Sequence, residues 1–175
     1  MNDPSANAPS ADLLIRDIST LVVEPGVEIP DAWLAVSDNR VAAYGRAGEE
    51  PEAAEVRSAG GRLVTPGLVN THHHMYQNLT RSFGPVVNGT LFDWLTGLYP
   101  LWTALDDESV YLSSYVAMAE LLLGGCTASS DHLYVHPRPG LVDAQVRAAQ
   151  DVGLRFLATR GSMSLSVEDG GLPPR

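Results

Sequence analysis

Cysteine is scarce in this chain, and the scarcity limits both its redox chemistry and its location. Cys126 is the only cysteine among 175 residues, so the chain cannot form an internal disulfide. Proteins without disulfides usually occur in a reducing compartment, and we expect this protein to be cytoplasmic. Cys126 directly follows Gly124-Gly125, between an expected helix and an expected strand. This setting is typical of a buried structural thiol rather than a nucleophile.

Basic residues and long apolar runs are also few. The chain has 11 Lys and Arg against 21 Asp and Glu, a formal net charge of −10 and a pI of about 4.7. An acidic surface disfavours nucleic-acid backbones and anionic membranes as partners, although a nucleobase remains open as a small substrate. No apolar run approaches the length of a membrane span. The 45% hydrophobic content is sufficient for a globular core.

Three common cofactor and metal motifs are missing. No Gly-x-Gly-x-x-Gly follows an expected strand, which disfavours a dinucleotide site. No His-Glu-x-x-His occurs, and one cysteine cannot supply the Pro-Cys-x-x-Cys of the cytidine-type deaminases. Any metal site must therefore be built in another way.

The segment with the most potential metal ligands joins a short apolar run to three consecutive histidines. Pro66-Gly67 precedes 68–71, which is too short for a helix and too apolar for a loop, and indicates a buried strand. Side chains alternate along a strand, so His72 and His74 point to one side and His73 to the other. Two imidazoles on one side form half of a metal site. An exposed polar turn and an affinity tag are the alternatives, and the internal position disfavours a tag.

The change in residue pattern along the chain predicts two domains. Residues 1–11 are small and polar, and we expect disorder there. Residues 12–65 contain short β-like runs separated by turn residues, with Asp38-Asn39 suited to a tight hairpin. We expect this region to be a small β-sandwich without chemistry of its own. Residues 66–175 alternate between strand-like and helix-like segments and form the second domain.

The second domain has the order strand, helix, strand, helix, strand. Strands are expected at 68–71, 126–130 and 154–160, and helices at 106–123 and 141–152. Short links between them predict parallel βαβ units and an α/β fold. We interpret the domain as the first three units of a (β/α)8 TIM-like barrel, with a doubly wound sheet as the competing architecture.

Polar residues gather where the three strands end. The histidines follow the first strand, Asp131 and His132 end the second, and Arg160 ends the third. An α/β barrel presents its active-site residues at the C-terminal ends of its strands. These residues are therefore the candidate functional residues.

A long connection follows the histidines. Residues 78–100 contain Gly-Pro and Asn-Gly breakers and a short helix capped by Thr90, with Asp93 at its third position. A loop leaving the ligand-bearing end of a strand is a natural lid or pocket wall. Trp94 and Trp102 are candidates to line that pocket, with core packing as the alternative for each.

Residues 12–175 resemble the amidohydrolase superfamily, and most closely its purine and triazine deaminase branch. The resemblance rests on a small β-domain followed by a barrel that opens with His-x-His. The segments 70–81, 91–95, 130–134 and 160–164 are similar to those of 8-oxoguanine deaminases.

The resemblance implies one divalent metal ion, zinc or alternatively iron, held by His72 and His74. It also implies a third histidine, an aspartate and proton-transferring residues on later strands. The expected acid and base groups would then lie beyond Arg175, and no catalytic residue is assigned here.

Further roles follow from the resemblance and from position along the chain. Positions matching Trp94 and Arg160 contact the small heterocyclic substrate in relatives. Gln77 lies one helical turn past His74 and is a candidate to pair with a purine edge, with a solvated loop amide as the alternative.

From its place at the strand end, Asp131 is expected to orient a neighbouring histidine. His132 and His136 are expected to line the pocket or lie at the surface, with a ligand role as the alternative.

The implied activity is hydrolytic deamination of an aminated purine-type ring such as 8-oxoguanine, in which a metal-bound hydroxide attacks and ammonia is released. S-adenosylhomocysteine deaminase and chlorotriazine hydrolase are alternatives within the branch. A non-catalytic remnant or interaction module is the alternative of another class. Because three of about eight barrel strands are accounted for, we expect an N-terminal portion that is inactive without the rest of the barrel. A homo-oligomer is compatible with the sequence.

Overall fold

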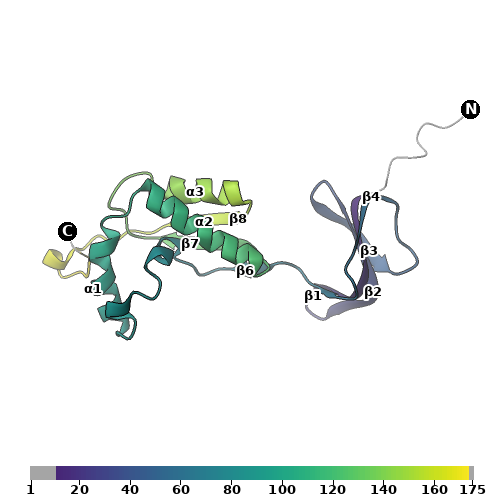
Figure 1. The fold of residues 1–175 in the computed structure, drawn as a ribbon, viewed down its shortest axis with the longest axis horizontal. Coiled ribbons are helices and arrows are strands. Elements are labelled where there is room, and N and C mark those ends of the chain that lie inside the picture. The colour runs from purple at the N-terminus through teal and green to yellow at the C-terminus, as the bar shows by residue number, and fades with distance from the viewer. Residues whose placement is uncertain (1–10, 174–175) are drawn as a thin grey trace, which may run out of the picture. The chain divides into compact units, whose positions relative to one another are not determined.

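The computed structural model describes residues 11–173, which divide between Pro66 and Gly67 into two compact units (Figure 1). The disorder expected over residues 1–11 falls outside the described residues, except at Ala11, which begins the first strand. Within residues 11–173, no helix has the length and apolar character needed to cross a membrane.

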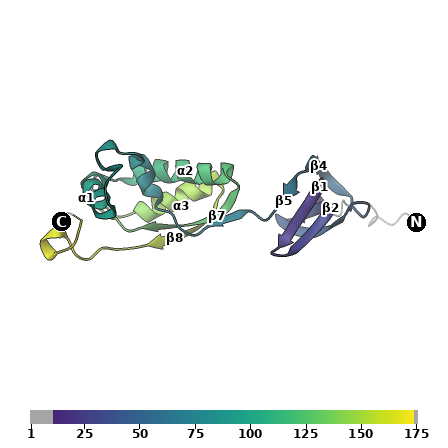
Figure 2. The same ribbon diagram turned by 90° about the horizontal axis from the view of Figure 1, so that it is seen from below.

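The N-terminal unit is a five-stranded sheet (Figure 2). Its central strand β1 pairs with β2 antiparallel, and with β4 and β5 parallel, while β3 lies outside β2. The strands are β1 (Ala11–Glu24), β2 (Val27–Ser37), β3 (Arg40–Arg46), β4 (Ala53–Ser58) and β5 (Leu63–Val64). These strands are hydrogen-bonded into a single sheet. The sandwich that we expect over residues 12–65 stays a prediction.

The β2–β3 connection is the tight hairpin that the sequence predicts. Ser37 pairs with Arg40, and the two residues between them, Asp38 and Asn39, have φ of 50° and 60°. Positive φ at both central positions is the geometry of a type I′ turn, which matches the twist of the flanking strands. Asp and Asn tolerate this conformation better than most residues.

Small apolar clusters lie on both faces of this sheet. Neighbouring residues of β2 face opposite ways, so Ala32 packs with Ile18 while Trp33 packs with Leu14. The Trp33 indole N–H donates to the carbonyl of Arg46 at 2.8 Å, which satisfies its one polar atom.

The C-terminal unit is a three-stranded parallel sheet in the order β6-β7-β8, with helices α2 and α3 side by side on one face (Figures 1 and 2). α2 links β6 to β7, and α3 links β7 to β8, so the predicted βαβ units and α/β fold are confirmed. The elements are β6 (Leu68–Asn70), η1 (Met75–Thr80), η2 (Gly84–Val86), α1 (Leu91–Trp102), α2 (Asp107–Leu123), β7 (Cys126–Leu133), α3 (Leu141–Val152), β8 (Arg155–Arg160) and η3 (Val167–Asp169).

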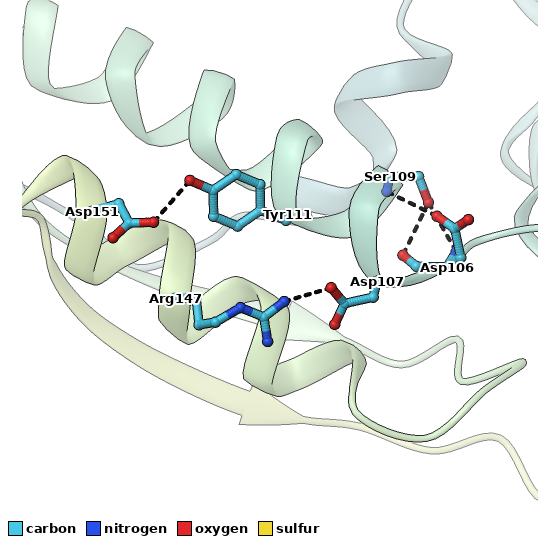
Figure 3. Close-up of polar contacts among 6 residues, drawn as sticks. All are labelled: Asp106, Asp107, Ser109, Tyr111, Arg147 and Asp151. Carbon is cyan, nitrogen blue, oxygen red and sulfur yellow. Dashed lines mark hydrogen bonds and ion pairs between the residues drawn. The ribbon is translucent and has the colours of Figure 1, made fainter.

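Two surface contacts join α2 to α3 (Figure 3). Arg147 donates to Asp107, and the Tyr111 hydroxyl donates to Asp151 at 2.8 Å. Each contact is one helical turn from the other on both helices, and both run in the same direction. The two helices are therefore parallel, as consecutive βα units require.

The helix starts follow capping signals in the sequence. Thr90 and Asp93 form a capping box at α1, and Asp106 and Ser109 form one at α2 (Figure 3). Hydrogen bonds from Thr90 lower the pKa of Asp93, and bonds from Ser109 lower that of Asp106. Gly124 ends α2 as expected.

The α1 helix is longer than the sequence indicates. It continues through Pro100 to Trp102, whereas the sequence predicted only a short helix capped by Thr90. Pro100 lies in the last turn, and the helix persists because Leu98, Tyr99 and Trp102 are buried there. Trp102 packs edge-on against Tyr76, with ring centroids 5.3 Å apart, so core packing is its role.

Candidate active site

The histidine segment continues the pairing between β6 and β7. The His132 N–H donates to the carbonyl of His73 at 2.9 Å, and the His132 carbonyl lies 2.7 Å from Nδ1 of His74. A carbonyl only accepts, so Nδ1 of His74 carries the proton in this contact. In the neutral ring this leaves the Nε2 lone pair available for a metal ion. A hydrogen bond that fixes the tautomer in this way is typical of metal-binding histidines.

His72 and His74 come together as their alternation predicts. Their ring centroids are 5.3 Å apart, and the rings meet edge-on at an angle of 87°. Nitrogen donors of this type suit zinc, which usually takes at least three protein ligands. Within residues 11–173, no group of three or more His, Cys, Asp or Glu side chains is placed to hold a metal ion. The described residues thus fit half of a zinc site.

His73 lies between the two and is partly buried. Burial is the main reason that its pKa lies below the ordinary value for histidine, which favours the neutral ring. Among the described residues its Nδ1 is buried without a hydrogen-bond partner. Its carbonyl, by contrast, anchors the segment to β7.

A cavity of about 430 Å³ opens at the histidines. Gln77 and Trp94 line it, so the structure brings these two predicted residues to the same hollow as His72 and His74. The Gln77 amide nitrogen lies 3.2 Å from the hydroxyl oxygens of both Tyr76 and Tyr134. The full lining is His72, His73, His74, Gln77, Asn78, Thr80, Arg81, Ser82, Trp94 and Glu120.

A second hollow of about 310 Å³ joins the histidines to the ends of β7 and β8. Asp131, His132 and Thr159 contribute to its lining. The His132 ring lies 5.6 Å from the His74 ring, and a Cβ at Gly161 would lie 2.3 Å from its Nε2. Glycine at 161 thus makes room for the His132 ring beside the site.

Asp131 is buried at the end of β7, with 1% of its surface exposed. One carboxylate oxygen accepts from the Met75 N–H at 2.6 Å, and the other from Gln145 Nε2 at 2.7 Å. Burial raises the pKa of Asp131, and these two hydrogen bonds oppose the rise.

Arg160 lies apart from the other predicted substrate residues. It lines a cavity of about 560 Å³ with His136 and the start of α3, and this cavity does not include His72 or His74. His136 Nε2 lies within 3.1 Å of the carbonyls of Leu133 and Gly161, so it links β7 to the segment after β8. A substrate role for Arg160 stays a prediction.

An ion pair that the sequence analysis did not identify borders the 430 Å³ cavity. Both terminal nitrogens of Arg81 donate to the Glu120 carboxylate at 2.9 Å. These bonds hold the pKa of Glu120 below its usual range. Glu120 is the only charged residue of α2 after its first turn, and that isolation was the available signal.

Comparison with known proteins identifies the family. The profile of the amidohydrolase family matches residues 63–172, which include the histidine segment, all three parallel strands and α2 and α3. The chain belongs to the amidohydrolase family.

The individual proteins that this chain resembles are deaminases and hydrolases. The chain is 49% identical to 8-oxoguanine deaminase of Pseudomonas aeruginosa over 147 aligned residues. The aligned region covers 81% of this chain and 32% of that enzyme. The chain is 37% identical to hydroxydechloroatrazine ethylaminohydrolase of Pseudomonas sp. strain ADP, over 93% of this chain and 32% of that enzyme. The chain therefore spans about a third of the length of these relatives.

Solved structures agree in fold. The zinc complex of atrazine chlorohydrolase from Arthrobacter aurescens TC1 superposes with a TM-score of 0.82 at 26% identity, covering 91% of this chain and 38% of that one. Guanine deaminase of E. coli gives a TM-score of 0.67 at 25% identity, over 84% of this chain and 37% of that one.

Proposed function

We propose that the protein containing this amidohydrolase chain is a zinc-dependent hydrolytic deaminase of an aminated purine-type ring, with 8-oxoguanine as the substrate. The observation that carries the proposal is the His72–His74 pair, whose rings lie 5.3 Å apart at the end of β6. The bond from His74 Nδ1 to the His132 carbonyl directs Nε2 of the neutral ring to a ligand. The 49% identity to an 8-oxoguanine deaminase supports the substrate.

His72 and His74 would hold one zinc ion through their imidazole nitrogens, with the other ligands supplied outside residues 11–173. When bound, zinc supplies Lewis-acid activation of water for attack on the ring carbon that bears the amine. The two histidines fix the ion beside the 430 Å³ cavity that receives the ring.

The remaining residues bind and orient the substrate. Trp94 offers an aromatic surface at the cavity wall, on which a planar ring stacks. The Gln77 amide nitrogen is held by the Tyr76 and Tyr134 hydroxyls, which fixes its side chain at the cavity. A fixed amide pairs with the polar edge of a purine. The Arg81–Glu120 pair forms part of the solvent-exposed rim of the cavity.

A second candidate substrate is an aminated or chlorinated triazine. It is favoured by the 37% identity to hydroxydechloroatrazine ethylaminohydrolase and by the fold likeness to atrazine chlorohydrolase. The two candidates differ in ring size, since a purine is bicyclic and a triazine is a single ring. We also propose a cytoplasmic location, because the one cysteine suits a reducing compartment.

Ammonia release by the full-length zinc-loaded protein tests the proposal. We expect turnover of 8-oxoguanine to exceed that of S-adenosylhomocysteine and of an aminotriazine, with chloride release assayed in parallel for a chlorotriazine. Faster triazine turnover would support the second candidate instead. Absence of turnover with all of them would reject a deaminase or hydrolase of this branch and favour an interaction module.

A further inference from the structure

Met75, the residue directly after His74, is held on both sides by buried side chains. Its N–H donates to Asp131 Oδ1, and its carbonyl accepts from Ser113 Oγ, each at 2.6 Å. Asp131 lies on β7 and Ser113 on α2, so two separate elements form hydrogen bonds with the backbone of Met75. The Met75 side chain itself is fully buried. The backbone of Met75, and with it the peptide that joins it to His74, is therefore held by hydrogen bonds at both its N–H and its carbonyl.

A third element completes the arrangement. Gln145 on α3 donates to the second carboxylate oxygen of Asp131 at 2.7 Å. Ser113, Asp131 and Gln145 are each 1% exposed. We call these three residues the Met75 clamp. Buried polar groups are costly unless hydrogen-bonded, and all three members of the clamp are.

The clamp also satisfies a backbone N–H at the start of η1. η1 begins at Met75, and the first N–H groups of a helix have no partner within it. His74 occupies the N-cap position but makes no side-chain cap bond, because its Nδ1 contacts the His132 carbonyl instead. Asp131 accepts from one of these groups, the Met75 N–H. The His74 side chain thus makes no bond to the start of η1, and its Nε2 remains available to a ligand.

We propose that Asp131, Ser113 and Gln145 are positioning residues, which fix the backbone at His74 and thereby the direction of its ring for zinc binding. The inference rests on the proposed function, in which His72 and His74 hold the metal. It adds that α2 and α3 determine metal affinity through residues that do not touch the metal.

Ser113 and Ser114 form a matched pair for the test. They are adjacent on α2, are 1% and 0% exposed, and lose the same atom on substitution by alanine. Ser113 holds Met75, whereas the Ser114 hydroxyl has no hydrogen-bond partner among the described residues. The zinc affinity of the full-length protein is measured by competition with a chromophoric chelator. We expect Ser113→Ala to weaken zinc binding about 3- to 10-fold and Ser114→Ala less than about 2-fold.

Two substitutions at Asp131 separate positioning from packing. Asp131→Leu removes both acceptors, and we expect zinc affinity to fall about 10- to 100-fold. Asp131→Asn keeps an oxygen for the Met75 N–H, and its Nδ2 donates to Gln145 once that amide has flipped. We therefore expect Asp131→Asn to stay within about 3-fold of the unaltered protein. If Asp131→Leu does not fold, Ser113→Ala and Asp131→Asn decide the matter.

The visible spectrum of the cobalt-substituted protein provides a second readout, since it reports ligand geometry. We expect altered bands in Ser113→Ala and Asp131→Leu, and unaltered bands in Ser114→Ala and Asp131→Asn. A clamp that only stabilises the fold would lower the melting temperature without changing zinc affinity or the cobalt spectrum, and this result would overturn the inference. Failure of the unaltered protein to bind zinc would instead overturn the proposed function on which it rests.

Discussion

The two units of this chain differ in where they keep their polar side chains. Five buried polar residues occur in the described part of the chain, namely Ser113, Ser114, Ser129, Asp131 and Gln145, and all lie in the C-terminal unit. Among residues 11–66, burial is confined to apolar side chains. Because buried polar groups cost free energy, their concentration marks the region where a precise arrangement matters.

Removing either of the histidines that we propose to bind zinc should have the largest effect on the C-terminal unit. We expect His72→Ala or His74→Ala in the full-length protein to abolish stoichiometric zinc and to lower turnover by about 10³-fold or more. His136→Gln is the control, because His136 contacts two backbone carbonyls rather than the histidine pair. Zinc content by elemental analysis measures the outcome. Full zinc occupancy in both alanine variants would contradict the site.

The core of the C-terminal unit should be the next most sensitive region. Trp102 is 1% exposed, and we expect Trp102→Ala to lower the free energy of unfolding by about 3–5 kcal/mol. Leu123→Ala removes a side chain that is 91% exposed, and should change it by no more than about 0.5 kcal/mol. Urea unfolding followed by tryptophan fluorescence and circular dichroism compares the two. Equal effects would show that the aromatic cluster does not support the fold.

A core substitution in the N-terminal sheet sharpens the comparison. Ile18 is 1% exposed, so Ile18→Ala should cost about 2–5 kcal/mol of stability. We expect no change in zinc affinity, since the described N-terminal residues hold no part of the histidine site. Val41→Ala, at a position 58% exposed, is the control. A fall in zinc affinity that matches the loss of stability would refute the separation of roles.

The Arg81–Glu120 pair should give the smallest effect. Because the folded-state pKa of Glu120 is depressed, the pair stabilises the fold above the ordinary value of 4.5, and this contribution is lost as pH falls through the folded pKa. We expect the protein to melt at most about 2 °C above Glu120→Gln at pH 7, and the difference to shrink as the pH falls below the ordinary value. High salt should reduce the difference, because both side chains are exposed. A difference that grows toward low pH would have the wrong sign.

Local signals were sufficient to predict most of the C-terminal fold. Turn residues and capping boxes such as Thr90–Asp93 give the order of strands and helices, since each depends on neighbours within a few positions. The end of α1 was wrong, because burial of Tyr99 and Trp102 outweighs the helix-breaking tendency of Pro100. Tertiary packing of that kind is not encoded in a short window of sequence.

The site was predicted only in part for the same reason. The His72–His74 pair follows from strand alternation, whereas Ser113 and Asp131 reach Met75 across 38 and 56 residues of chain. Gln145 lies on the face of α3 that also buries Leu141, Ala144 and Ala148, and a polar residue among these apolar ones was the available sign of a buried partner. Such contacts depend on the docking of α2 and α3 onto β7.

Anomalous diffraction at the zinc edge, from crystals of the full-length protein, tests the central claim most directly. The account predicts one zinc peak about 2.0–2.1 Å from an imidazole nitrogen of both His72 and His74. A fully occupied zinc ion bound elsewhere, with these two rings uncoordinated, would contradict it.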